Sequence, residues 1–305
     1  MSAQTEILLI SAVVAVACAL PGTFLVLRKM ALISDAISHS ILLGIVIAFF
    51  ITPDLNSPLL IIGAALMGVL TVTLTEIIVR TRRVKEDAAI GLVFPFLFSI
   101  GVILITRFAG NVHLDIDAVL SGEVILTPFD RLKINEIDLG PRAFWVMLGI
   151  LVLNLLFIIS FYKELKIVTF DQQLAASLGI NVGFIHYGLM TITSITAVGA
   201  FDSVGAILVV ALMIVPPATA YLLTEKLSDM IGMSVLVAII SSTAGFFIAQ
   251  LFNTSISGSM TTICGIIFFM VLFFAPRRGI FQKYFRHGQL GAKSSVSIEN
   301  QSTLN

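Results

Sequence analysis

An acid and a histidine inside an apolar segment are the residues whose chemistry stands out. Asp35 and His39 lie in the string MALISDAISHSILLG, and ionisable side chains in such a segment are costly and usually functional. Their separation of four residues places both on one face of a helix, where a carboxylate and an imidazole can bind one divalent transition metal ion in transit. Three serines could orient them or line a hydrated path: Ser34, Ser38 and Ser40. An Asp–His hydrogen bond within the helix explains the spacing equally well, so both interpretations stay open.

Four further carboxylates are candidates for contact with the same cation. Three of them share the hydrophilic stretch 109–142: Asp115, Asp117 and Glu123. Their negative potential could gather cations at an entrance. Asp202 interrupts a long apolar run and could act as a metal ligand, or it could cap a helix that begins near Ser203. Exposed carboxylates are commonly only solvated, so these four are weaker candidates than the first pair.

Motifs of membrane enzymes and ATPases are missing from the chain. The sequence contains no HExxH, GxSxG or GxxxxGK[ST] string. Cys18 and Cys264 lie far apart in apolar runs, so we expect buried thiols rather than metal ligands. We therefore expect no enzymatic activity and no permanently bound cofactor. Energy for uphill movement of a solute would come from a partner protein or from an ion gradient.

Membrane-spanning helices must position these residues. The chain is 58% hydrophobic and 12% charged, with a mean hydropathy of +1.06, whereas soluble domains carry about 25% charged residues. A span needs about 20 apolar residues, and nine stretches qualify: 6–27, 31–51, 57–79, 88–108, 143–162, 183–201, 203–223, 230–252 and 256–275. The pair 183–201 and 203–223 is nearly continuous, so a tight turn and a partial segment are both open, and eight spans is the alternative count. We predict an all-α integral membrane protein with one domain over 1–288 and a disordered tail over 289–305.

The distribution of basic residues predicts the orientation. If RTRRVK (80–85) is placed in the cytoplasm and the spans alternate, most of the 18 lysines and arginines fall on the cytoplasmic side, as the positive-inside rule requires. The N-terminus is then outside and the C-terminus in the cytoplasm of a plasma membrane. In a bacterium this is the inner membrane. The zero net charge gives no reason to expect nucleic-acid binding.

The predicted cytoplasmic connection 163–182 contains the string FDQQLAASLGI. Its polar start and its glycine four residues after an alanine predict a short helix that ends in a glycine turn. This pattern resembles the coupling segment of ABC-importer permeases. The resemblance implies that four residues help to dock the segment on a nucleotide-binding subunit: Phe170, Asp171, Ala175 and Gly179.

Three longer strings extend the resemblance over about 6–275: LRKMALISDAISHSILLG, HLDIDAVLSGE and VGAILVVALMIVPPATA. They resemble the manganese/zinc/iron ABC permease family, which is distantly similar to the vitamin B12 and siderophore permeases. The resemblance implies two permeases, identical or paralogous, two cytoplasmic ATP-binding subunits and an external metal-binding protein. In this family a DxxxH pair on the second span is thought to bind the passing metal, and it corresponds to Asp35 and His39.

We predict the permease of an ATP-driven importer for a divalent transition metal. The alternative is a gradient-driven secondary transporter or channel for divalent cations. Such proteins need no coupling segment and commonly contain inverted repeats, whereas this sequence shows no second ionisable pair. Carboxylate ligands without a thiolate favour Mn²⁺ or Fe²⁺ as the substrate, with Zn²⁺ as the alternative.

Overall fold

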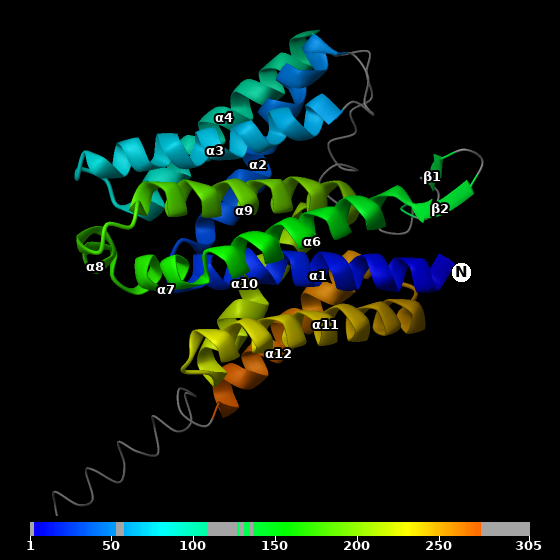
Figure 1. Cartoon of the computed structure of the whole chain (residues 1–305). Coiled ribbons are helices and arrows are strands. Elements are labelled where there is room, and N and C mark those ends of the chain that lie inside the picture. Colours follow the sequence, from blue (N-terminus) through cyan, green and yellow to red (C-terminus); the bar gives the residue numbers. More distant parts are fainter. Residues whose placement is uncertain (1–2, 53–57, 109–126, 128–130, 135–136, 276–305) are drawn as a thin grey trace, which may run out of the picture.

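Nine membrane-length helices dominate the part of the chain that the structure describes (Figure 1). The computed structural model describes residues 3–52, 58–108, 127, 131–134 and 137–275. Within these residues the helices long and apolar enough to cross a bilayer are α1 (Ala3–Leu27), α2 (Ala31–Ile51), α3 (Pro58–Arg80), α4 (Glu86–Phe108), α6 (Arg142–Ser160), α9 (Val182–Val204), α10 (Ala206–Leu223), α11 (Leu227–Phe252) and α12 (Ile256–Phe274). The predicted α-helical membrane fold with nine spans is confirmed. The predicted tail over 289–305 lies outside the described residues.

Two short helices and a hairpin complete the described elements: α7 (Tyr162–Phe170), α8 (Gln172–Ser177), and the antiparallel strands β1 (Arg131–Ile134) and β2 (Ile137–Pro141). In Figure 1, the connection between α3 and α4 lies at the same end of the helices as α7 and α8, while the N-terminus and the hairpin lie at the other. An ion pair between Arg131 and Glu6 (2.8 Å) ties the hairpin to α1. If the predicted spans alternate in direction across the membrane, their connections must lie at two opposite ends of the helices, and the described elements have this arrangement.

A single glycine separates α9 from α10. α9 continues to Val204 and α10 begins at Ala206, with Gly205 between them at φ 82° and ψ 161°. Residues with a Cβ avoid this backbone conformation, so glycine makes the reversal possible in one residue. The tight-turn interpretation is therefore correct. Asp202 lies in the last turn of α9, so the interpretation of Asp202 as a helix cap is wrong.

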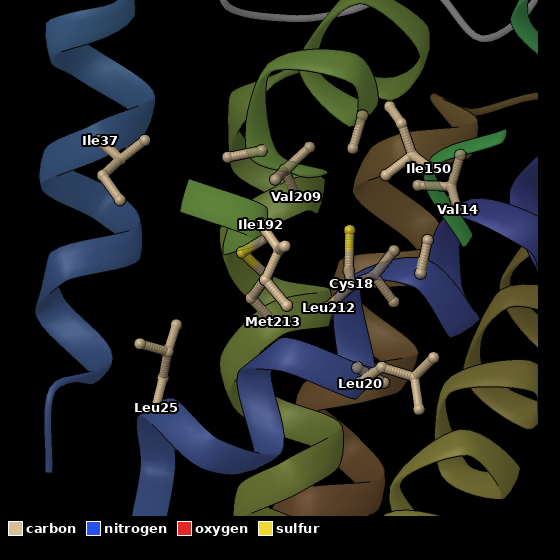
Figure 2. Packing of buried hydrophobic residues seen from close by; sticks show 14 of the residues in the cluster. Val14, Cys18, Leu20, Leu25, Ile37, Ile150, Ile192, Val209, Leu212 and Met213 are labelled. Carbon is tan, nitrogen blue, oxygen red and sulfur yellow. The ribbon is translucent and has the colours of Figure 1, made fainter. Parts of the chain in front are cut away.

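The main hydrophobic core lies where α1 packs among α6, α9, α10 and α11. Figure 2 shows Cys18 of α1 near Leu212 of α10 and Ile150 of α6. The helices approach closely here, because a Cβ added to Gly22 would overlap the backbone of Met213. Asn154 of α6 is fully buried in the same region and donates to the carbonyl of Ala17 (3.0 Å). Both cysteines are buried free thiols, as predicted.

A second, smaller core joins α2, α3 and α4. Its buried members are Leu43, Met67, Val93 and Leu97. α2 and α3 touch backbone to backbone at Gly44 and Gly63, where a Cβ on either residue would overlap the carbonyl of the other. Small residues permit such close helix packing in membranes. This three-helix unit carries the Asp–His pair and meets the main core through the packing of α3 on α9 and of α2 on α9 and α10.

Candidate metal transit site and coupling segment

Asp35 and His39 lie on one face of α2, in its second and third turns. The Nε2 atom of His39 lies 3.5 Å from the Oδ1 atom of Asp35, and the two side chains are 33% and 40% exposed respectively. This separation is long for a hydrogen bond. Both groups therefore keep lone pairs that a cation could reach. At 1.5 Å rise per residue, His39 lies about 12 Å along the helix from its first residue.

Aromatic rings of α4 fix the plane of the imidazole. The ring of His39 stacks on Phe94, with 5.7 Å between centroids and an angle of 29°, and meets Phe98 edge-on at 6.1 Å. These contacts restrict the ring so that Nε2 stays beside Asp35. Sequence reasoning missed both aromatic residues. Their spacing of four in the fourth span was the only signal, and it does not reveal which helix they face.

The serines of α2 do not orient the pair. The hydroxyl of Ser34 donates to the carbonyl of Ala31, and that of Ser38 donates to the carbonyl of Ser34. The Ser40 hydroxyl donates to the carbonyl of Ile37 and accepts a hydrogen bond from Thr71 of α3. Serines inside helices commonly bond to their own backbone in this way, so the expectation that they position the pair is wrong.

The pair offers two protein ligands. No group of three His, Cys, Asp or Glu side chains that could hold a metal occurs among the described residues. Asp202 is exposed near the opposite end of the helices from the first turn of α2. The other predicted carboxylates lie outside the described residues: Asp115, Asp117 and Glu123. An ion held by the pair would need water or backbone oxygens to complete its coordination.

The coupling segment is a short helix closed at both ends by its own residues. Asp171 is the N-cap of α8, and its Oδ1 atom accepts hydrogen bonds from the backbone N–H of Gln173 (3.0 Å) and of Leu174 (2.9 Å). Gly179 has φ +79°, and the bonds from Gly179 N–H to Ala176 and from Ile180 N–H to Ala175 form a Schellman turn. The predicted short helix and glycine turn are present.

Three apolar side chains at the coupling segment point away from the protein. Phe170, Leu174 and Leu178 are 63%, 49% and 60% exposed, whereas Ala175 is fully buried in the main core. Ala175 therefore anchors the segment and cannot itself contact a partner, which corrects its expected role in direct docking. Sequence reasoning missed Leu174 and Leu178. The spacing of four between them was a signal, because it places both on one face of α8 and its C-cap.

Basic residues accompany this end of the helices. Arg28 lies between α1 and α2, and its Nε atom donates to the hydroxyl of Thr169 at the end of α7 (3.2 Å). The side chains of Arg82, Arg83 and Lys166 are exposed there. The loop before the Asp–His helix is thus bonded directly to the segment that carries the exposed apolar face.

Comparison with known proteins places this architecture among transporters. The sequence profile of the ABC 3 transport family matches residues 3–275. The manganese transport system membrane protein MntD of Bacillus subtilis is 46% identical over 286 residues, covering 94% of this chain and 97% of MntD. The zinc transport system membrane protein TroD of Treponema pallidum is 50% identical over 278 residues, covering 91% of this chain and 76% of TroD. The solved structure of PsaBC from Streptococcus pneumoniae in complex with Fab superposes with a TM-score of 0.75 at 31% identity, covering 91% of this chain and 94% of that chain.

Proposed function

Because this chain belongs to the ABC 3 transport family, we propose that it is the membrane-spanning permease of an ATP-driven importer for a divalent transition metal. The observation that carries the proposal is the match over nearly the whole chain to relatives named for manganese and zinc transport. The nine candidate spans fit a multi-pass protein of the plasma membrane. No described feature favours the gradient-driven alternative.

ATP hydrolysis belongs to partner subunits in this proposal, because the sequence has no nucleotide-binding motif. Two cytoplasmic ATPase subunits would contact the exposed apolar face of the coupling segment, which consists of Phe170, Leu174 and Leu178. A second permease, identical or paralogous, completes the membrane part. An external metal-binding protein delivers the substrate. The excess of basic residues at the coupling end supports a cytoplasmic C-terminus and an external N-terminus.

Asp35 and His39 form the transit site for the metal. Two protein ligands, with water for the remainder, bind an ion weakly enough to release it, as conduction requires. The carboxylate supplies an oxygen and the imidazole a nitrogen, and the imidazole binds metal only when it is neutral. Uptake should therefore decline in acid, where a proton competes with the metal for His39.

Manganese or iron is the proposed substrate, with zinc as the alternative. An oxygen-containing site without thiolate suits the harder ions, and relatives of this chain are named for both manganese and zinc. Two protein ligands alone cannot reject zinc, which binds most such sites more tightly than manganese. The external binding protein and the coordination geometry must therefore supply the selection.

The test is radiometal uptake by cells that express wild-type, Asp35→Asn or His39→Gln protein at equal levels. Each substitution keeps the side-chain size but removes the carboxylate charge or the imidazole nitrogen. Because changes even around the ligands of a metal site commonly cost tenfold or more, we expect at least a tenfold loss of uptake. Asp229→Asn is the matched control, because this carboxylate is exposed at the start of α11. Wild-type rates in both variants would refute the site. Uptake of zinc alone by wild-type protein would refute the proposed preference for manganese or iron over zinc. It would not contradict the assignment of Asp35 and His39 as the transit site.

A further inference from the structure

A pocket of about 440 Å³ lies at the coupling end of the helices, apart from the Asp–His pair. The connection between α1 and α2, the end of α3, the starts of α4 and α9, and the coupling segment line it. One wall is apolar and includes Leu27, Met30 and Val72. The polar part of the lining has eight members: Arg28, Lys29, Thr75, Glu76, Glu86, Thr169, Gln172 and His186.

Buried donors in this pocket have no acceptor. Nη1 and Nη2 of Arg28 are both buried, and no described residue accepts a hydrogen bond from either. Only Nε of the same guanidinium is bonded, to Thr169. Nε2 of His186 is also buried and unbonded, and this side chain is 14% exposed. Burial lowers the pKa of Arg28 to about 10, because a buried guanidinium loses the hydration that favours its charged form.

The acid closest to these donors is committed elsewhere. Glu76 accepts a hydrogen bond from Arg80 at Oε1 (2.9 Å) and from the hydroxyl of Tyr187 at Oε2 (2.6 Å). Its Oε2 atom lies 4.0 Å from Nε2 of His186, too far for a hydrogen bond. Glu76 therefore neutralises Arg80, as its spacing of four residues suggests. Glu86 also lines the pocket, but neither carboxylate lies within ion-pair distance of Arg28.

We propose that this pocket binds a phosphate group. The two free Nη atoms of a guanidinium form a fork that matches two oxygens of a phosphate, and His186 as its Nε2–H tautomer adds a third donor. A buried guanidinium between helices near the membrane surface suits an anionic lipid headgroup, and the apolar residues beside it, Leu27 and Met30, fit the glycerol end of a lipid. Free phosphate offers the same chemistry without that apolar contact.

The bound group would join three elements. Arg28 precedes α2, His186 belongs to α9, and Thr169 and Gln172 flank the N-cap of the coupling helix. A ligand that binds only the folded protein stabilises it by an amount that increases with the logarithm of its concentration once the site is largely occupied. Occupancy should therefore raise the melting temperature of the protein.

The experiment measures thermal unfolding of full-length protein in dodecyl maltoside, a detergent without phosphate. Inorganic phosphate, short-chain phosphatidylglycerol and phosphate-free short-chain diacylglycerol are added in separate arms at equal ionic strength. We expect a rise in Tm with at least one of the phosphate compounds and none with diacylglycerol. A rise with phosphatidylglycerol alone identifies a lipid headgroup, and a rise with inorganic phosphate shows that the free ion suffices.

Arg28→Gln should shift the half-saturating concentration at least tenfold, and Arg83→Gln, which removes an exposed charge at the same end, should leave it unchanged. If Arg28→Gln does not fold, Arg28→Lys retains the charge without the fork and should still weaken binding. The proposal fails if neither phosphate compound raises the Tm of wild-type protein, or if the folded Arg28 variants respond as wild type does. Metal transport is not part of the readout, so this outcome is independent of the proposed function.

Discussion

Gly179 gives the sharpest test of the coupling segment. Its φ of +79° lies in the left-handed region, and no atom lies within 4 Å of the position that a Cβ would take. The cost of Gly179→Ala is therefore conformational rather than steric. The left-handed conformation costs a residue with a Cβ about 1–2 kcal/mol. The cost is smaller for asparagine and larger for a β-branched residue.

This cost is large beside the stability of the helix that it closes. α8 has six residues, and helices this short are marginal on their own. An N-cap such as Asp171 stabilises a helix by about 1 kcal/mol. The backbone strain that a substitution at position 179 introduces therefore offsets this stabilisation or exceeds it. A loss of about 1–2 kcal/mol lowers the ratio of ordered to frayed α8 by about five- to thirtyfold. The exposed apolar face would then rarely be presented to the ATPase.

The assay is co-purification of the ATPase subunit together with metal uptake, at equal amounts of inserted permease. We expect both to fall in the order wild type, Gly179→Asn, Gly179→Ala and Gly179→Val. Gly232→Ala is the matched control, because Gly232 lies inside α11 with no atom near its added Cβ and alanine favours a helix interior by about 1 kcal/mol. Wild-type uptake and co-purification in Gly179→Val would refute the reasoning.

Three further predictions use other parts of the chain. Asp171→Ala removes the acceptor for two N–H groups and should cost about 1 kcal/mol, measured as reduced co-purification of the ATPase that Asp171→Ser restores. Asn154→Leu should lower the midpoint of unfolding in mixed detergents, because it deletes buried hydrogen bonds to Ala17 of α1 and Thr196 of α9, each worth about 0.6 kcal/mol in a membrane; an unchanged midpoint would contradict this. Cysteines at Arg82 and Lys166 should resist an impermeant thiol reagent in intact cells, while one at Glu123 should react. The reverse pattern would invert the orientation.

Hydropathy predicted the spans well because apolar length is a property of each segment alone. The ends differ by a few residues where polar groups belong to a helix. α4 begins at Glu86 rather than at residue 88, and α9 continues through Asp202 to Val204. A span predicted from hydropathy ends at such a charge. The backbone of α9, in contrast, stays helical past Asp202 until Gly205 reverses the direction of the chain. The hairpin was not predicted, although the alternation in RLKI at 131–134 is the pattern of a strand.

For the candidate site, too, the features set by one segment could be predicted and those set by packing could not. Helical spacing was enough to pair Asp35 with His39, because four residues bring side chains together in any helix. The aromatic neighbours of His39 come from α4 and the burial of Ala175 comes from the main core, and both depend on contacts between distant segments. The unbonded donors of Arg28 and His186 are likewise a result of packing, which no local pattern records.

The two cores have different consequences for how the chain is made. The α2–α4 unit is continuous in sequence, so its packing partners reach the bilayer together during synthesis. α1 packs against α10 and α11, and the hydroxyl of Thr23 meets that of Ser234, more than two hundred residues later in the chain. The first span to be inserted therefore meets α10 and α11 only after α6 and α9, its other packing partners, have been made. Before Ser234 is present, the hydroxyl of Thr23 already has a hydrogen-bond acceptor, because the carbonyl of Ala19 lies within its own helix.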